Sequence, residues 1–321
     1  MNFKSSTGHD LRVRLKTSLL GMVGSFVLFA AYLAVPPIGI FSGVLAPFPA
    51  AYNRLLYGRL ASLIVLLGAA AATTALFGLF AGCLYLGMCG MVGLFMPELL
   101  LRGIGGSKAL FWTTAANVVI FATCIAAYSA FSGFNLQQLI TGEIDNSLKQ
   151  AVALYEKGGV TGEELEVVKR SMATAASMLQ RLYPALVTIL LSVIAGCNLA
   201  LIKKAASKTA ANLAIGDFST FRNPDLLVWL LIASGFSLLL PDSPVTTPAL
   251  NLLLILTLLY FLQGMAVITA FITKKTVPAL VKILLYVALV IQPYLLVIVA
   301  GLGLFDLWGD FRTPKTPQEN L

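Results

Sequence analysis

The chain has 321 residues, of which 58% are hydrophobic and only 11% are charged. Soluble domains contain about half apolar and about a quarter charged residues, so this composition excludes an ordinary soluble protein. Disordered and fibrous proteins are excluded too, because apolar residues abound and Gly and Pro are present at ordinary levels, which leaves an integral membrane protein.

The positions of the charges support this class. Three long stretches contain no charged residue: 17–53, 60–97 and 109–141. Each can hold at least one helix of about 20 residues, the length that crosses roughly 30 Å of hydrocarbon. The net charge of +8 raises nucleic-acid binding as an alternative, but the basic residues are spread thinly between apolar stretches. That spread is typical of charges that orient membrane helices, so we expect the lipid bilayer as a partner and no nucleic acid.

The chain predicts an all-α fold, a polytopic bundle of nine transmembrane helices, with eight as the alternative. The first helix follows a basic leader and is too long for a signal peptide. Helix 38–54 is the weakest span because it is short and contains Pro47 and Pro49, so a re-entrant segment is its alternative. Pro293 is a second candidate break, in the last helix. The nine helices are expected at 17–35, 38–54, 60–77, 79–101, 109–131, 183–202, 226–240, 249–273 and 279–304.

These helices divide the chain into four parts. Residues 1–131 hold the first five helices, 132–182 form a soluble insertion, 183–304 hold the last four helices, and 305–321 are a polar tail. Cytoplasmic segments are enriched in Lys and Arg. Placing the N-terminus in the cytoplasm puts 15 of the 22 basic residues on that side. We therefore expect a multi-pass protein of the bacterial inner membrane, with the insertion on the opposite side. The C-terminus lies outside with nine spans and inside with eight.

The insertion predicts a helical hairpin that breaks at Gly158 and Gly159. Thr161 and Glu164 then have the spacing of a capping box that opens the second helix. The apolar residues of that helix recur at intervals of three and four, which makes one stripe, and we expect the first helix of the hairpin to cover it. The membrane interface and another protein are the alternatives. The stripe consists of Leu165, Val168, Met172, Ala175, Leu179 and Leu182.

The inventory of reactive side chains argues against an enzyme. His9, in the basic leader, is the single histidine, so His-dependent triads, zinc motifs and proton relays inside the membrane are excluded. No P-loop sequence is present, and none of the four cysteines forms a CxxC pair. We expect no catalytic residue, no metal and no cofactor.

Uncharged polar residues are the candidates for a ligand site. Asn117, Asn198, Tyr260 and Gln263 lie inside predicted spans. Interhelical hydrogen bonds are the alternative role for each of them. Together they also offer what a cavity for an uncharged or zwitterionic solute requires.

A second set of residues lies near the ends of the predicted spans. Glu98 and Arg102 have the i,i+4 spacing of an ion pair at the cytoplasmic interface, and a proton-coupling carboxylate is the alternative for Glu98. Near the C-terminus Trp308 has the position of an interface anchor. Asp306, Asp310 and Arg312 can pair with one another or with neighbouring loops.

Three motifs carry a resemblance to a known family. They are Phe218-x-x-Phe221-Arg222-x-Pro224-Asp225-x-x-x-Trp229, Leu259-Tyr-Phe-Leu-Gln263-Gly264 and Gly303-Leu-Phe-Asp306-x-Trp308-x-Asp310-x-Arg312. Together they resemble the YybS-like family of predicted bacterial membrane proteins, whose function is undefined. The first six helices are also loosely similar to the substrate-binding S-components of energy-coupling-factor transporters.

Two functions follow as expectations. The first is a non-catalytic membrane subunit that binds or passes a small solute, with other membrane subunits, including a separate ATPase, supplying energy. The second is a membrane scaffold or regulator that acts through its insertion and its termini.

Overall fold

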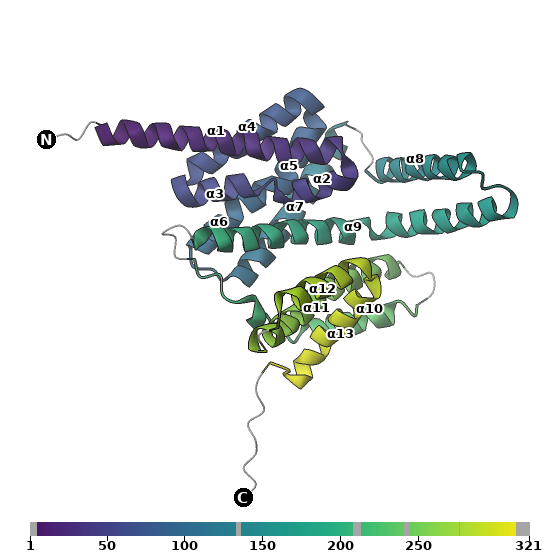
Figure 1. Ribbon diagram of the computed structural model, residues 1–321. Helices are drawn as coiled ribbons and strands as arrows, with labels where there is room; N and C mark the ends of the chain where they lie inside the picture. Colours follow the sequence, from purple (N-terminus) through teal and green to yellow (C-terminus); the bar gives the residue numbers. More distant parts are fainter. Residues whose placement is uncertain (1–4, 133–135, 208–212, 241–243, 276, 313–321) are drawn as a thin grey trace, which may run out of the picture. The chain divides into compact units, whose positions relative to one another are not determined.

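The structure is a computed structural model that describes residues 5–132, 136–207, 213–240, 244–275 and 277–312. The described residues form helices and connecting turns and contain no strand, which confirms the all-α class. The chain divides into two compact units. The N-terminal unit comprises Met1–Phe134 and Leu190–Gly216, and the C-terminal unit comprises Asn135–Ile189 and Asp217–Leu321. The helix α9 (Gly162–Ala206) contributes to both units (Figure 1).

The N-terminal unit packs its helices around α4. Extensive interfaces join α4 to α1, α3 and α5 and join α1 to α2, and α7 lies against α5, η1 and α6. The elements are α1 (Ser5–Ala34), α2 (Pro36–Leu45), α3 (Phe48–Tyr57), α4 (Arg59–Phe77), α5 (Leu79–Gly90), the π-helical turn η1 (Met91–Phe95), α6 (Met96–Leu101), α7 (Gly106–Ser132) and the last part of α9.

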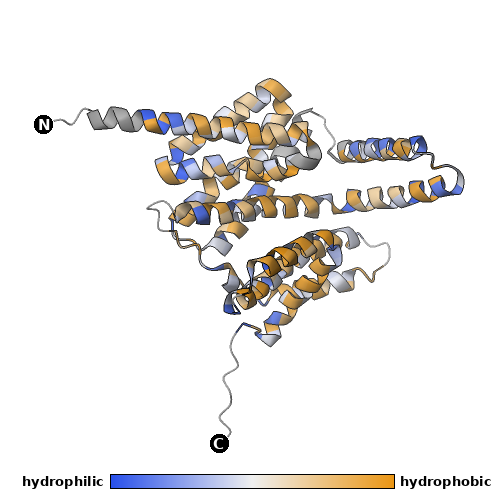
Figure 2. Ribbon diagram, in the orientation of Figure 1, coloured by the Kyte–Doolittle hydropathy of each residue, from blue (hydrophilic) through white to orange (hydrophobic). Residues whose placement is uncertain are grey.

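The C-terminal unit is centred on the pair α11 and α13, its most extensive interface. Figure 2 shows both helices largely hydrophobic, in contrast to α8, where hydrophilic residues dominate. The elements are α8 (Leu136–Lys157), the first part of α9, the 3-10 turn η2 (Phe218–Thr220), α10 (Leu227–Ser237), α11 (Thr246–Lys274), α12 (Ala279–Ile291) and α13 (Pro293–Gly309).

The predicted number of nine spans is not confirmed. Among the described residues five helices are long and apolar enough to cross a membrane, or six if the bent pair α12 and α13 is counted as one span. The five are Arg12–Ala34, Arg59–Phe77, Leu79–Leu101, Gly162–Ala206 and Thr246–Lys274. The chain turns by 107° between α12 and α13, at the break that Pro293 predicts.

Two predicted spans are too short in the structure. Segment 38–54 is divided between α2 and α3, which have 10 residues each, and α10 has 11 residues. At 1.5 Å per residue these helices are about 15–17 Å long, roughly half of the hydrocarbon thickness. The divided segment is the broken backbone that Pro47 and Pro49 predict.

The insertion begins as expected and continues differently. α8 ends at Lys157 and α9 begins at Gly162, so the helices are separated at Gly158 and Gly159. However, α9 then runs without interruption for 45 residues, so the second helix of the insertion and predicted span 183–202 form one helix. Its apolar stripe is only partly covered, because Leu179 is 47% exposed.

Prolines break the pattern of backbone hydrogen bonds in two long helical segments. At each proline a polar side chain from another helix bonds to a backbone group left without its helical partner. Pro97 has no N–H to donate to the carbonyl of Gly93, four residues earlier. The hydroxyl of Ser62, on α4, donates to this carbonyl at 3.1 Å. The π-helical turn η1 lies just before this proline, which is consistent with a local change in the bonding pattern.

The same compensation occurs at Pro184 in α9. The N–H of Ala185 donates to Oδ1 of Asn251, on α11, at 2.8 Å. Nδ2 of Asn251 donates to the carbonyl of Arg181, also at 2.8 Å. In an unbroken helix these two backbone groups would bond to each other. One amide therefore bonds to both of these backbone groups beside Pro184.

This arrangement predicts a stability defect that a second substitution repairs. Asn251→Ala leaves two backbone groups without partners and should lower the free energy of unfolding by about 1–3 kcal/mol. Adding Pro184→Ala restores the helical bond and should recover most of that loss. Thermal unfolding of the two variants in mild detergent measures both effects. No recovery in the double variant would contradict the assigned role of Asn251.

Candidate functional site

The buried polar face of α7 is the candidate ligand site. Asn117 is 1% exposed, yet its amide nitrogen and its amide oxygen both lack a hydrogen-bond partner among the described residues. The hydroxyls of Thr113 and Thr114, one turn earlier, also lack partners there. A buried amide without partners costs about 1–3 kcal/mol. Four unpaired polar atoms on one helical turn therefore mark a place where a polar molecule would be stabilised.

The face of α7 that carries Asn117 points into the N-terminal unit. Gly106, Ala109, Thr113 and Asn117 are buried and recur every three or four residues, so they form one stripe. Phe121 continues this stripe and lies against Gly87 of α5. Asn117 is 11 residues into α7, which has 27 residues, and so lies about 16 Å along the helix axis, close to the middle of this helix.

The other three predicted ligand residues have different surroundings. Asn198 is fully buried, and its Nδ2 donates to the carbonyls of Val44 and Ile194 at 2.8 and 2.7 Å. It thus joins α9 to the end of α2, as the interhelical alternative predicts. Tyr260 and Gln263 lie on α11 in the C-terminal unit. Tyr260 is 1% exposed, and its hydroxyl has no partner within the described chain.

A second cluster surrounds Glu98 with three arginines of the N-terminal unit. Arg102 donates to Oε1 at 3.0 Å, the i,i+4 pair expected from the sequence. Arg59 donates with Nε and Nη2 to both carboxylate oxygens, at 3.1 and 2.5 Å. Arg54 adds a further bond to Oε2 at 2.5 Å. Glu98 is thus the centre of an ion-pair network rather than of a single pair.

Sequence reasoning missed Arg54 and Arg59 at this site. Both were expected on the same side of the membrane as Arg102, next to the ends of neighbouring spans. This shared position at the ends of neighbouring spans was the feature of the sequence that pointed to the cluster. Without the packing of α3 and α4 it does not indicate that three arginines reach one carboxylate.

The three sequence motifs come together in the C-terminal unit around Asp306. This side chain is 2% exposed. Its Oδ2 accepts from Nη2 of Arg312 at 2.6 Å and from Nε2 of Gln263 at 3.1 Å. Gln263 in turn accepts the backbone N–H of Asn223 at 3.0 Å. Asp306, Arg312 and Gln263 are motif residues, and Asn223 lies between the motif residues Arg222 and Pro224, so the three motif segments meet in one network.

Hydrogen bonds from two arginines connect the same network to the loop that precedes α10. Nη1 of Arg312 donates to the carbonyls of Ser219 and Phe221 at 2.9 and 2.8 Å. Arg222 donates in the opposite direction, to the carbonyl of Leu307 at 3.0 Å. These three hydrogen bonds all join an arginine side chain to a backbone carbonyl, which is the pattern of a structural contact.

Two glycines bring the backbones of α11 and α13 into contact beside this network. A Cβ atom added at Gly303 would lie 2.0 Å from the carbonyl oxygen of Tyr260 and 2.5 Å from the nitrogen of Gly264. A Cβ added at Gly264 would lie 1.9 Å from the carbonyl oxygen of Val299. Only glycine permits this approach, which is characteristic of helices that pack through small residues in membranes.

Trp308 and Asp310, the last two residues singled out near the C-terminus, lie at the end of α13. Trp308 is 68% exposed, as a side chain at the membrane interface would be. Asp310 follows the helix in the left-handed conformation, with φ of 36°. It is thus the residue that ends α13, the position at which glycine or asparagine is usual.

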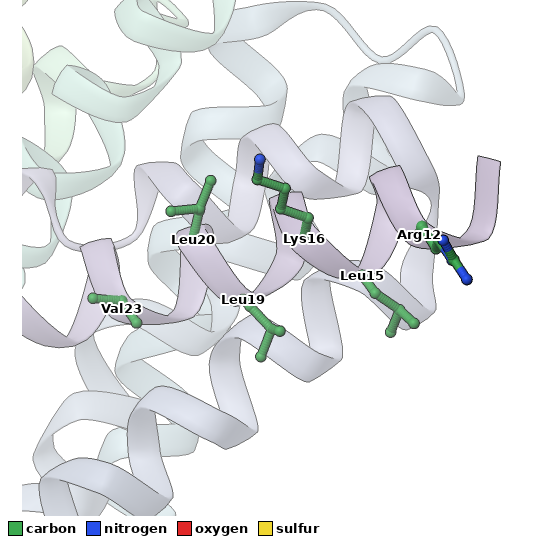
Figure 3. A pocket seen from close by; sticks show the side chains of 6 residues that line it. All are labelled: Arg12, Leu15, Lys16, Leu19, Leu20 and Val23. Carbon is green, nitrogen blue, oxygen red and sulfur yellow. The ribbon is translucent and has the colours of Figure 1, made fainter. Parts of the chain in front are cut away.

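A shallow, open pocket runs along the exposed face of α1 (Figure 3). All six lining residues belong to this one helix: Arg12, Leu15, Lys16, Leu19, Leu20 and Val23. Its apolar part is contributed by leucines and a valine that are 48–64% exposed, and the two bases lie toward the N-terminal end. This is the pattern of a lipid-facing helix that enters the interface, rather than of a solute site.

The comparison with protein families agrees with this picture. A family model described as a predicted membrane protein, DUF2232, matches residues 24–307. The chain belongs to this family. It is the same family as the YybS-like proteins that the three motifs resemble, whereas the similarity to energy-coupling-factor S-components receives no support. No curated protein and no solved structure shows significant similarity to the chain.

The DUF2232 match covers both units and most of the features above. Glu98, Asn117, Gln263 and Asp306 lie within the matched residues, and Arg312 lies beyond their end. Membership establishes a membrane protein with several apolar helices.

Proposed function

We propose that this chain is a non-catalytic subunit of the bacterial inner membrane that binds a small uncharged or zwitterionic solute at the Asn117 face of α7. The observation that supports this most directly is the amide of Asn117, which is buried with neither of its polar atoms bonded to a described residue. Asn251 differs, because both of its polar atoms bond to backbone groups of α9. Asn198 is intermediate, because its Nδ2 is bonded and its Oδ1 is not bonded to any described residue.

The chemistry of the face suggests the class of solute. An asparagine amide offers two N–H donors and one carbonyl acceptor, and each threonine hydroxyl can donate and accept. Charged side chains are absent from α7 between Ala109 and Ser132. A ligand with amide, hydroxyl or paired opposite charges matches these groups, whereas a ligand with net charge would be buried without a counter-ion.

The sequence has no P-loop, so transport of such a solute driven by ATP would need another subunit. A separate ATPase subunit would provide the energy, and the membrane chain would then select the solute.

The proposal predicts that Asn117→Leu reduces solute binding by about tenfold or more, since the ligand loses its bonds to the amide. The full chain is purified in mild detergent, and the small molecules that co-purify with it are quantified by mass spectrometry. Thermal stability of the ligand-free variant should not fall, because the substitution removes a buried polar group that has no protein partner.

A matched pair of threonines on the same helix provides the control. Thr113→Val removes a hydroxyl without a partner and should also reduce binding, whereas Thr123→Val removes an exposed hydroxyl bonded to its own helix and should not. A solute retained equally by all three variants, or no solute in the wild-type chain, would refute the proposal.

The alternative is a membrane scaffold that acts through the hairpin of α8 and α9. It is favoured by apolar side chains that remain exposed there: Leu154 is 69%, Val167 60% and Met178 58% exposed. Under this alternative the Asn117 variants change neither a bound solute nor the cellular phenotype, whereas polar substitutions at these three positions change the phenotype.

A further inference from the structure

The cluster of Arg54, Arg59 and Arg102 around Glu98 carries a positive charge that no other described side chain balances. Three guanidinium groups face one carboxylate, and the hydrogen bonds that these four side chains make with described residues are all within this cluster. The cluster therefore has two positive charges in excess. Each guanidinium has five N–H donors, and Glu98 receives only four bonds in all.

Burial makes part of this excess positive charge energetically unfavourable. The side chain of Arg54 is 13% exposed, and its buried Nε has no partner among the described residues. Arg59 and Arg102 are 61% and 64% exposed, so a ligand can reach the cluster from outside. A buried cationic edge beside two accessible guanidiniums is an arrangement that an external anion would complete.

The surrounding backbone also favours an anion. Arg59 is the first residue of α4, and the residue before it, Gly58, has no side chain to cap the helix. The first N–H groups of a helix and its dipole attract negative charge. Arg102 directly follows the span Leu79–Leu101, so the cluster lies at the ends of two apolar spans, where lipid headgroups are found in a bilayer.

We infer that this cluster binds an anionic phosphate group through the N–H donors of the arginines that Glu98 does not occupy. Arginine forks match the oxygen geometry of phosphate and are preferred for its recognition. The phosphate belongs either to an anionic lipid headgroup or to a free phosphate ion. This inference stands independently of the proposed solute site at Asn117.

The test uses the full chain in mild detergent, titrated with three probes. These are short-chain phosphatidylglycerol, phosphatidylcholine of the same chain length, and inorganic phosphate, each monitored by calorimetry. We expect saturable binding of phosphatidylglycerol and none of phosphatidylcholine, because a choline headgroup brings no net charge. Binding of phosphatidylglycerol alone assigns the site to lipid, and equal binding of inorganic phosphate assigns it to the free ion. Absence of both overturns the inference.

Two variants test whether binding depends on the arginine cluster or on any positive charge nearby. Arg102→Gln removes one exposed guanidinium and should weaken binding about fivefold, as expected for one basic residue near a membrane surface. Lys108→Gln removes an exposed positive charge six residues further along that lies outside the cluster, and should change the affinity by less than about twofold. Equal losses in the two variants would overturn the inference.

Glu98→Gln is expected to change the binding affinity in the opposite direction. It removes the internal anion that competes with the ligand, so a folded variant should bind phosphatidylglycerol or phosphate more tightly than the wild type. A cluster that only stabilises the fold would show no such gain.

Discussion

Gly303→Ala is expected to lower the free energy of unfolding by about 3 kcal/mol, because a methyl group there has no room. The added carbon would lie 2.0 Å from the carbonyl oxygen of Tyr260, which is backbone and cannot rotate away. The helices α11 and α13 must therefore separate, and the contacts of their whole interface weaken. Unfolding in mild detergent with increasing dodecyl sulfate measures the change.

The same helix supplies the control. Gly301 has no atom within 4 Å of an added Cβ, so Gly301→Ala should be neutral or stabilise the helix by about 1 kcal/mol. In Gly264→Ala plus Gly303→Ala the second substitution should cost less than the first, since the helices have already moved apart. Equal effects at 301 and 303 would show that the two backbones are not in contact.

Arg312→Gln is expected to lower the free energy of unfolding by about 3–5 kcal/mol, since it leaves a carboxylate buried without its counter-charge. Asp306 is 2% exposed and retains only the amide of Gln263 and the backbone N–H of Phe311 as partners. Adding Asp306→Asn removes the unpaired charge and should restore part of the loss. Thermal unfolding of the single and double variants gives the coupling energy between the two side chains.

Arg222→Gln is the matched control for this experiment. Arg222 also reaches α13, but through one exposed hydrogen bond to the carbonyl of Leu307. Its loss should cost about 0.5–1.5 kcal/mol. A larger effect at 222 than at 312 would contradict the central place of Asp306 in this unit.

The sequence predicts the features that depend on one segment at a time. Apolar length predicts α4 and α11, Gly78 separates α4 from α5 with a φ of 89°, and Pro293 marks the bend before α13. The predicted count of spans is not confirmed where apolar segments are divided or bent, because length and hydropathy do not distinguish a short buried helix from a full crossing.

The roles of the buried amides could not be predicted in the same way. Asn117, Asn198 and Asn251 are the same residue type in similar apolar helices. Asn198 and Asn251 bond to backbone groups freed at the end of α2 and at Pro184, and Asn117 meets no such break. Which amide remains available to a ligand therefore depends on which helix ends lie opposite it, a property of the tertiary packing.

The bond between Asn198 and Val44 has a consequence for the order in which the protein is built. The two residues are 154 positions apart. At about 5–20 residues per second, the ribosome completes Asn198 roughly 8–30 s after Val44. During this interval the carbonyl at the end of α2 has no protein donor, and hydrocarbon offers none. We therefore expect α2 and α3 to reach their final packing only after the residues of α9 that include Asn198 have been made.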